Sequence, residues 1–316
     1  LKPGECISPI GLQCALALQF FSDKRTDFNV LEGGKGVQYD DVNNVFHDYA
    51  VINTIFLEHT RELGKTLEEI AMDKACIMTG DQKYAYTAEQ ADVVMEILQK
   101  RAAETNTHLK QYGKDFSAEN IQYRRDGMIF DICIREEMVR GVVLPLLGGH
   151  QAKNCALAMA VCQDILNDRF SGETAKAAVK KLRWPGRMEI LSAEPLTILD
   201  ASINAKSAEM VMDVLKKMQI SEATVIIGIP DDKDYAGVAK KVAPIASSII
   251  LTKSSNTHYR FSDIQEKTLR KEGLSEVCFY NLPQALKEAE KRRKTILILG
   301  TTSLISDVEK LYDSEL

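Results

Sequence analysis

The second half of the chain alternates strongly apolar segments with segments of helical periodicity, and this alternation restricts the fold more than any other feature. The apolar segments are PLTILDA, ATVIIGIP, SSIILTKSS, EVCFYNL and TILILG. Strands that alternate with helices form a mostly parallel sheet, which binds ligands at the carboxyl ends of its strands. Since no glycine fingerprint follows the first of these strands, the sequence disfavours dinucleotide binding by this half.

The first half also mixes helices and strands. Helical periodicity is present in ISPIGLQCALALQFF, from about Ala88 to Glu104, and at the end of GGHQAKNCALAMAVCQDILND. Strands are predicted for DFNVLE and AVINTIFLEH, and a β-hairpin for NIQYRR and MIFDICIREE around Asp126-Gly127. Helix breakers concentrate in RWPGRM, between two periodic regions. We therefore predict an α/β protein with one domain at 1–184 and a second at 185–316.

Composition limits the classes of function. A chain of 316 residues with 45% hydrophobic and 27% charged residues is typical of a soluble protein with two domains. The net charge of -5 disfavours a nucleic-acid surface. Seven cysteines without paired spacing indicate a reducing compartment, and no segment resembles a membrane span or a signal peptide. We predict a cytoplasmic protein with neither a nucleic-acid nor a membrane partner.

Lys74 interrupts the apolar stripe of a predicted helix, Thr66 to Met78. Thr66 and Glu69 have the spacing of a capping box, which anchors the register of this helix and turns Lys74 inward. An inward lysine has three interpretations: its amine extends to water, pairs with a buried acid, or stays neutral and available for chemistry.

Two metal-capable positions end the predicted strands of the first half. Glu32 closes DFNVLE and His59 closes AVINTIFLEH, so both lie where an α/β sheet binds ligands. Each alone is more often structural, but together with an inward lysine they suggest one site. The GGKG run after Glu32 is not a Walker loop because Lys35 is followed by Gly36, so its glycines are expected in tight turns and Asp40-Asp41 in a solvated loop.

Seven further runs, in one order along the chain, match a known family. They are VLEGGKGVQYDDVNNV, INTIFLEHTRELGKTLEEIAMDKA, LPLLGGHQAKNCALAMA, RWPGRMEIL, LTILDASINAKSA, the Asp-Lys-Asp of GIPDDKDY, and TILILGTTSL. In these runs the chain resembles folylpolyglutamate synthase and dihydrofolate synthase, within the Mur ligase superfamily. The resemblance implies a Mur-ligase-type central ATPase domain over 1–184 and a Rossmann-like C-terminal domain over 185–316.

The resemblance also implies roles for individual residues. Glu32 and His59 match the family's magnesium ligands, and Lys74 matches the lysine that becomes carbamylated. The family's contacts with ATP are matched by Asn154, Arg187 and Asp200, together with His150 and Gln151 of the HQAKN run. A neutral buried lysine can capture carbon dioxide, and the resulting carbamate is an oxygen ligand suited to Mg²⁺. The implied cofactors are ATP and Mg²⁺.

The implied reaction is ATP-dependent amide formation. A carboxylate takes the γ-phosphoryl group to give an acyl phosphate, and an amino group then attacks the activated carbonyl. The implied partners are small molecules: a carboxylate acceptor, a folate in the family, and an amino acid such as glutamate.

The chain departs from the family at several places. The family's phosphate loop precedes the region that matches Leu1, so we expect this chain alone to be inactive unless a second chain supplies that loop. Gln38, Gly149, Ile203 and Ala205 replace the arginine, arginine, histidine and proline that the family commonly has. Glu58 replaces an aspartate. The alternative is a non-catalytic, ligase-like binding or assembly protein in which Lys74 and His59 are structural.

Overall fold

The computed structural model describes residues 8–274 and 276–313. These residues form two compact units: the first includes the described residues up to Ser117 together with Leu157–Ile165, and the second includes Ala118–Ala156 and the described residues from Leu166 onward. The predicted domain boundary between residues 184 and 185 lies inside the second unit and stays a prediction.

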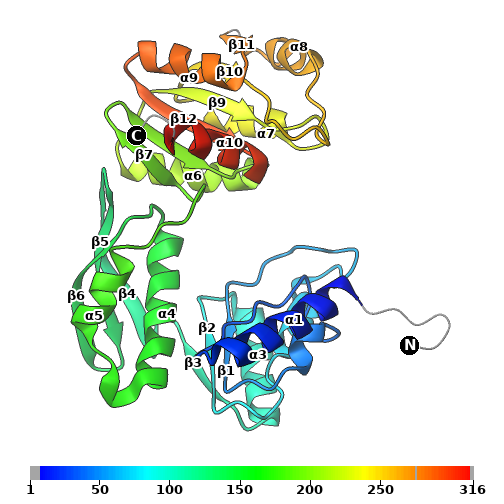
Figure 1. Ribbon diagram of the computed structural model, residues 1–316, viewed down its shortest axis with the longest axis vertical. Coiled ribbons are helices and arrows are strands. Elements are labelled where there is room, and N and C mark those ends of the chain that lie inside the picture. The colour runs from blue at the N-terminus through cyan, green and yellow to red at the C-terminus, as the bar shows by residue number, and fades with distance from the viewer. Residues whose placement is uncertain (1–7, 275, 314–316) are drawn as a thin grey trace, which may run out of the picture. The chain divides into compact units, whose positions relative to one another are not determined.

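The first unit contains a three-stranded parallel sheet with the order β1-β2-β3 (Figure 1). The strands are β1 (Tyr49–Ile52), β2 (Tyr84–Thr87) and β3 (His108–Gln111). The helices are α1 (Pro9–Lys24), η1 (Asp41–Asn44), α2 (Leu67–Ala75) and α3 (Asp92–Glu104). Alternate strand residues and the apolar stripes of α2 and α3 form one buried core.

The capping box predicted for α2 is confirmed. The Thr66 hydroxyl accepts a hydrogen bond from the Glu69 backbone N–H, and the Glu69 carboxylate accepts one from the Thr66 backbone N–H. The stripe buries Ile70, Ala71 and Ala75, as its helical spacing predicts.

Of the two strands predicted to carry Glu32 and His59, DFNVLE is wrong, and AVINTIFLEH is confirmed only in its first residues, which belong to β1. DFNVLE forms no strand, and Val30 within it is 90% exposed. AVINTIFLEH pairs with β2 only as far as Ile52. Beyond that residue its backbone bonds to side chains, as where the Ile55 N–H donates a hydrogen bond to Gln90 Oε1. The ladder ends there because side chains satisfy the backbone that a neighbouring strand would otherwise pair. Glu32 and His59 therefore lie on loops.

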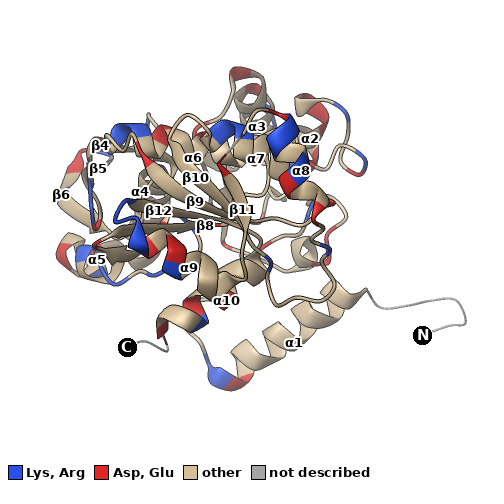
Figure 2. Cartoon of the chain, turned by 90° about the horizontal axis from the view of Figure 1, so that it is seen from above, with Lys and Arg blue, Asp and Glu red and all other residues tan. Residues whose placement is uncertain are grey.

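Helix α1 is confirmed where the sequence predicts a helix. Its buried residue is Cys14, whereas Leu16 and Phe20 are 62% and 55% exposed. In Figure 2 the ribbon of α1 has the colours of charged residues only near its end, and the charged residues there in the sequence are Asp23 and Lys24. The helix therefore leaves apolar side chains on the surface of the first unit.

The second unit begins with the predicted hairpin, to which a third strand is added in the order β4-β5-β6. The strands are β4 (Phe116–Arg124), β5 (Gly127–Ile134) and β6 (Glu137–Leu144). The helical elements that follow along the chain are α4 (Gly149–Leu166), η2 (Asn167–Arg169) and α5 (Gly172–Val179). The turn at Asp126-Gly127 joins β4 to β5, so the predicted hairpin is confirmed.

A six-stranded sheet with the order β11-β10-β9-β12-β8-β7 completes the second unit. The strands are β7 (Glu189–Ala193), β8 (Leu196–Asp200), β9 (Ala223–Gly228), β10 (Ala246–Leu251), β11 (Val277–Phe279) and β12 (Thr295–Gly300). The helices are α6 (Ala205–Lys217), α7 (Tyr235–Val242), α8 (Ile264–Lys271), α9 (Leu282–Lys291) and α10 (Thr302–Asp313).

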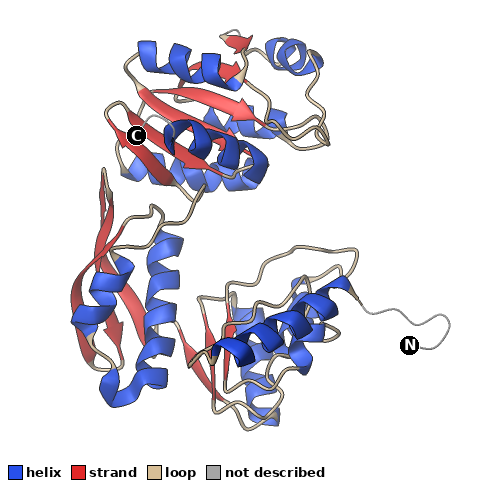
Figure 3. Ribbon diagram, viewed as in Figure 1, coloured by secondary structure: helices blue, strands red, loops and turns tan. Residues whose placement is uncertain are grey.

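Five strands of this sheet are parallel, and β7 runs antiparallel to β8. Figure 3 shows helices on both faces, and α9 and α10 share one apolar cluster with β8, β9, β10 and β12. All five strands predicted from the apolar segments are confirmed, as is their parallel arrangement. Residues 8–274 and 276–313 include no helix with the length and apolar character that crossing a bilayer requires.

A buried polar group fixes the end of α4 to the first sheet. Tyr86 and Lys110 are register partners on β2 and β3, and both contact the Asp164 carboxylate: the tyrosine hydroxyl donates a hydrogen bond and the lysine forms an ion pair. Burial, followed by the hydrogen bond to Asp164, raises the pKa of Tyr86, so its hydroxyl stays a donor.

We predict that Asp164→Ala destabilises the first unit strongly. The substitution leaves the Lys110 ammonium, which is mostly buried, without this carboxylate, and breaking a buried ion pair costs about 3 kcal/mol. Urea unfolding measures the loss, with Asp168→Ala as the control because Asp168 is exposed on η2. Equal stabilities of the two variants would show that the buried carboxylate contributes little.

Candidate cation and nucleotide sites

Lys74 lies on the last turn of α2 and is turned inward, with 21% of its side chain exposed. Its Nζ is 3.1 Å from Glu58 Oε1 and donates a hydrogen bond to the backbone oxygen of Lys35 at 3.3 Å. Of the three interpretations of Lys74 given by the sequence, the structure agrees with the second, in which the amine pairs with an acid. Carbamylation of Lys74 stays a prediction.

Glu58 also approaches His59. The distance from Glu58 Oε2 to His59 Nε2 is 3.9 Å, and the positive φ of His59 turns the backbone sharply at this point. Glu32 lies on an exposed loop, and no contact described for it joins it to Lys74 or His59. The structure therefore brings Lys74, Glu58 and His59 together and leaves Glu32 apart.

The chemistry of these side chains fits a hard cation only in part. Carboxylate oxygens and an imidazole nitrogen are suitable ligands, and a Lys74 carbamate would add further oxygens. Among the residues that the structure describes, no three His, Cys, Asp or Glu side chains form a cluster of the size that a metal ion needs. A cation held by Glu32, His59 and carbamylated Lys74 remains a prediction.

Asp73, which the sequence analysis did not identify, holds the GGKG loop. Its carboxylate accepts hydrogen bonds from the backbone N–H groups of Val37 and Gln38, at 2.7 Å and 3.4 Å. An acid on the last turn of a helix opposes the helix dipole. That unfavourable position is the sequence signal that points to a separate role for Asp73.

The neighbouring acid Asp40 is also structural. It accepts hydrogen bonds from the backbone N–H groups of Gly34 and Val42 and caps η1, which differs from the solvated loop expected for Asp40-Asp41. Two acids, Asp40 and Asp73, thus bind the backbone of the GGKG loop and of the residues directly after it.

Asp200 ends β8 at the carboxyl edge of the large sheet, and its carboxylate is buried. One oxygen accepts a hydrogen bond from Met188 N–H at 2.9 Å, and the other accepts one from the Ser202 hydroxyl at 2.5 Å. Burial raises the pKa of Asp200, and the two hydrogen bonds and the Arg187 cation oppose that rise. Asp200 therefore joins the strand end to the RWPGRM segment.

His150 begins α4, and its ring lies against Gly148, where an added Cβ would be 2.5 Å from the ring. Although His150 is exposed as a residue, desolvation of its ring lowers the pKa of His150, and the Arg187 cation lowers it further, so the neutral imidazole is favoured. Because Arg187 acts on both His150 and Asp200, three of the residues predicted to contact ATP are within electrostatic reach of one another.

The other two candidates for ATP contact lie on the same helix as His150. Gln151 is buried and Asn154 is half-buried on α4. The contacts of all five residues with ATP stay predictions.

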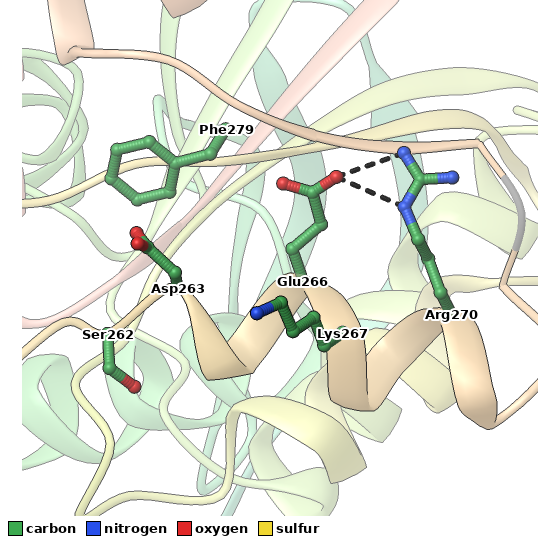
Figure 4. A pocket seen from close by; sticks show the side chains of 6 residues that line it. All are labelled: Ser262, Asp263, Glu266, Lys267, Arg270 and Phe279. Carbon is green, nitrogen blue, oxygen red and sulfur yellow. Dashed lines mark hydrogen bonds and ion pairs between the residues drawn. The ribbon is translucent and has the colours of Figure 1, made fainter.

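A small pocket of about 190 Å³ lies elsewhere, between α8 and the end of β11. Figure 4 shows its lining: Ser262, Asp263, Glu266, Lys267, Arg270 and Phe279. Glu266 and Arg270 form an ion pair at 3.0 Å across two adjacent helical turns. The pocket contains none of the residues predicted for the cation or ATP, so it is separate from both candidate sites.

Comparison with known proteins relates the chain to ligases. Residues 7–162 match the Mur ligase middle domain. The chain is 24% identical over 299 residues to folylpolyglutamate synthase of Lacticaseibacillus casei, which covers 94% of this chain and 69% of that protein. It is 26% identical over 316 residues to dihydrofolate synthase/folylpolyglutamate synthase of Bacillus subtilis, covering 95% and 71%.

The chain is a homologue of these synthases. Folylpolyglutamate and dihydrofolate synthases are ATP-dependent ligases. The chain also matches the synthase of Mycobacterium tuberculosis at 25% identity over 261 residues, which is 79% of this chain but 54% of that relative, so it spans about half of the relative's length.

Solved structures of such synthases share the fold of this homologue. Folylpolyglutamate synthase of Mycobacterium tuberculosis, complexed with ADP and AMPPCP, has a TM-score of 0.84 at 23% identity, covering 98% of this chain and 74% of that one. The enzyme from Thermotoga maritima has a TM-score of 0.82 at 24% identity, covering 96% and 70%. The predicted α/β fold, a Mur-ligase-type domain followed by a Rossmann-like domain, is confirmed.

We predict that the unfolding free energy of Asp200→Asn increases relative to that of the unsubstituted protein as the pH rises. Because its folded pKa is raised, the contribution of Asp200 to stability is complete below about pH 3.9, the ordinary value for an unfolded chain, and is lost as the pH passes the raised value. The amide does not titrate, so the difference in unfolding free energy between the variant and the parent should grow by up to about 1.4 kcal/mol per pH unit in that window.

Urea unfolding between pH 4 and pH 8 measures this difference. Asp168→Asn is the control, since Asp168 is exposed and its substitution should give a difference that is nearly constant with pH. A constant difference for Asp200→Asn would contradict the prediction.

Proposed function

We propose that this protein is an ATP-dependent ligase that joins a carboxylate to an amine through an acyl phosphate. The observation that carries the proposal is the inward Lys74, paired with Glu58 beside His59, in a homologue of folylpolyglutamate synthases. A lysine in this setting becomes an oxygen ligand for Mg²⁺ once it captures carbon dioxide, with Glu32 and His59 as the further ligands.

ATP binds, in this proposal, at the residues that surround Arg187. Asn154, Arg187 and Asp200, with His150 and Gln151, hold the nucleotide, and Mg²⁺ offsets the repulsion between its phosphates and the attacking carboxylate. Support comes from the nucleotides named for two solved structures of the Mycobacterium tuberculosis synthase, ADP and AMPPCP. The electrostatic grouping of His150, Arg187 and Asp200 also supports it.

The substrates that we propose are a folate as carboxylate acceptor and glutamate as the amine. Folate appears in the name of one solved synthase complex with a TM-score of 0.75. We place the reaction in the cytoplasm, in accord with the cysteines of the described residues, which are present as thiols and not as disulfides.

We further propose that these 316 residues alone do not sustain the reaction, because they contain no GxxxxGK[ST] phosphate loop. The comparisons give no support to a second chain that supplies one. A non-catalytic binding protein, in which Lys74 and His59 are structural, is the second candidate, and it is favoured because no three His, Cys, Asp or Glu side chains among the described residues form a group that could hold a metal ion.

Carbamylation separates these two candidates. In ¹³C-enriched bicarbonate with Mg²⁺ at alkaline pH, we expect a protein carbamate signal in ¹³C NMR spectra that Lys74→Met removes. Lys65→Met is the matched control, because Lys65 precedes the same helix but is exposed, and it should leave the signal unchanged. A spectrum without the signal, or a signal that survives Lys74→Met, favours the non-catalytic protein.

Nucleotide binding tests the second part of the proposal. Arg187→Ala should weaken ADP binding about tenfold, the effect of losing one charge-assisted hydrogen bond, at a temperature where circular dichroism shows the variant folded. Arg124→Ala is the control, because Arg124 is an exposed arginine at the end of β4 in the same unit. Ligand-observed NMR suits the weak binding expected without a phosphate loop, and equal affinities would remove Arg187 from the site.

A further inference from the structure

The loop from Gly33 to Gln38 is fixed to α2 through its backbone. The Asp73 carboxylate accepts hydrogen bonds from the backbone N–H groups of Val37 and Gln38. The next residue, Lys74, donates a hydrogen bond from its Nζ to the backbone carbonyl of Lys35. These contacts involve main-chain atoms of the loop, so they do not depend on which side chains the loop carries. Adjacent residues of one helical turn thus hold both polar groups of the loop backbone.

Gly36 leaves room for this contact, because a side chain there would displace the ends of Asp73 and Leu63. A Cβ added at Gly36 would lie 2.8 Å from Asp73 Oδ1 and 2.7 Å from Leu63 Cδ2, both shorter than any normal contact. Gly33, in the same loop, has the backbone oxygen of Gly36 as its nearest neighbour, at 4.0 Å. Neither glycine has a positive φ. The preference for a residue without a side chain at Gly36 therefore comes from the close approach of Asp73 and not from the backbone conformation.

Asp73 occupies an unfavourable position on its helix, which indicates that its hydrogen bonds to the loop contribute to stability. A negative charge on the last turn of a helix is unfavourable, because it opposes the helix dipole. The two backbone N–H groups that donate to the Asp73 carboxylate offset that cost, since hydrogen bonds to a charged acceptor are the stronger kind.

We propose that Asp73 is a positioning residue for the cation site, an inference that rests on the proposed function. Asp73 anchors the loop that directly follows Glu32, and the same loop presents the Lys35 carbonyl that locates the Nζ of Lys74. Anchoring the loop thereby holds the end of Lys74 in place before a cation binds. Asp73 itself stays outside the ligand set because its oxygens are occupied by backbone N–H groups.

Hydrogen exchange tests the anchor by itself. Asp73→Ala removes both acceptor oxygens, whereas Gly36→Ala keeps the carboxylate and displaces it, so both variants should speed amide exchange at Val37 and Gln38 about tenfold. Asp73→Asn, which retains one acceptor, should give an intermediate rate. Two matched controls, Glu68→Ala on the exposed side of α2 and Gly33→Ala in the open part of the loop, should leave exchange unchanged.

Binding of Mn²⁺, followed by electron paramagnetic resonance in the presence of bicarbonate, tests the positioning role. We expect affinity to fall in the order parent, Asp73→Asn, Asp73→Ala, with Gly36→Ala also weakened, while circular dichroism melting shows each variant folded. Unchanged exchange in Asp73→Ala and Gly36→Ala overturns the anchor. Faster exchange with unchanged Mn²⁺ affinity overturns the positioning role, and a parent protein without Lys74-dependent Mn²⁺ binding overturns the proposed cation site while leaving the exchange result standing.

Discussion

The last turn of α2 is the element on which the candidate cation site depends. Asp73 and Lys74 are adjacent in sequence, carry opposite charges, and contact the same loop from the same helix. The capping box at Thr66 fixes where this helix begins, and its buried stripe fixes which side faces inward. The ion pair with Glu58 extends that order to His59. A helix of nine residues therefore organises two loops that have no regular structure of their own.

In the second unit two titratable residues of the candidate nucleotide site, Asp200 and His150, lie at the end of a strand and at the start of a helix. Asp200 is buried at a strand end and accepts hydrogen bonds from two neighbours, so its carboxylate is organised by the protein before any ligand arrives. Arg187 influences both Asp200 and His150, which links a sheet edge to the first turn of α4. Strand ends and helix starts are the places where backbone geometry leaves polar groups unpaired, and this unit combines both.

Local sequence predicts elements well where burial is continuous. The strands at ATVIIGIP and TILILG are apolar apart from one threonine each and are almost entirely buried, so their sequences predict buried strands of a parallel sheet. Strands β2 and β3, with the short sequences YAYT and HLKQ, were missed because polar residues on one face contact Asp164, which lies far along the chain. The error at DFNVLE has the same cause, since strand formation needs a neighbouring strand that the local sequence does not reveal. The pairing of Lys74 with Glu58 likewise depends on tertiary structure, although the inward direction of the lysine was predictable.

The apolar surface of α1 has a practical consequence for anyone who handles this protein. Leu16 and Phe20 lie exposed on a helix whose charged residues are confined to its end. Kosmotropic salts strengthen apolar contacts, while dissolved ions screen exposed ion pairs such as Lys35 with Glu62. Buffers of low ionic strength, dilute samples and mild detergents are therefore the conditions under which its colloidal behaviour should be best.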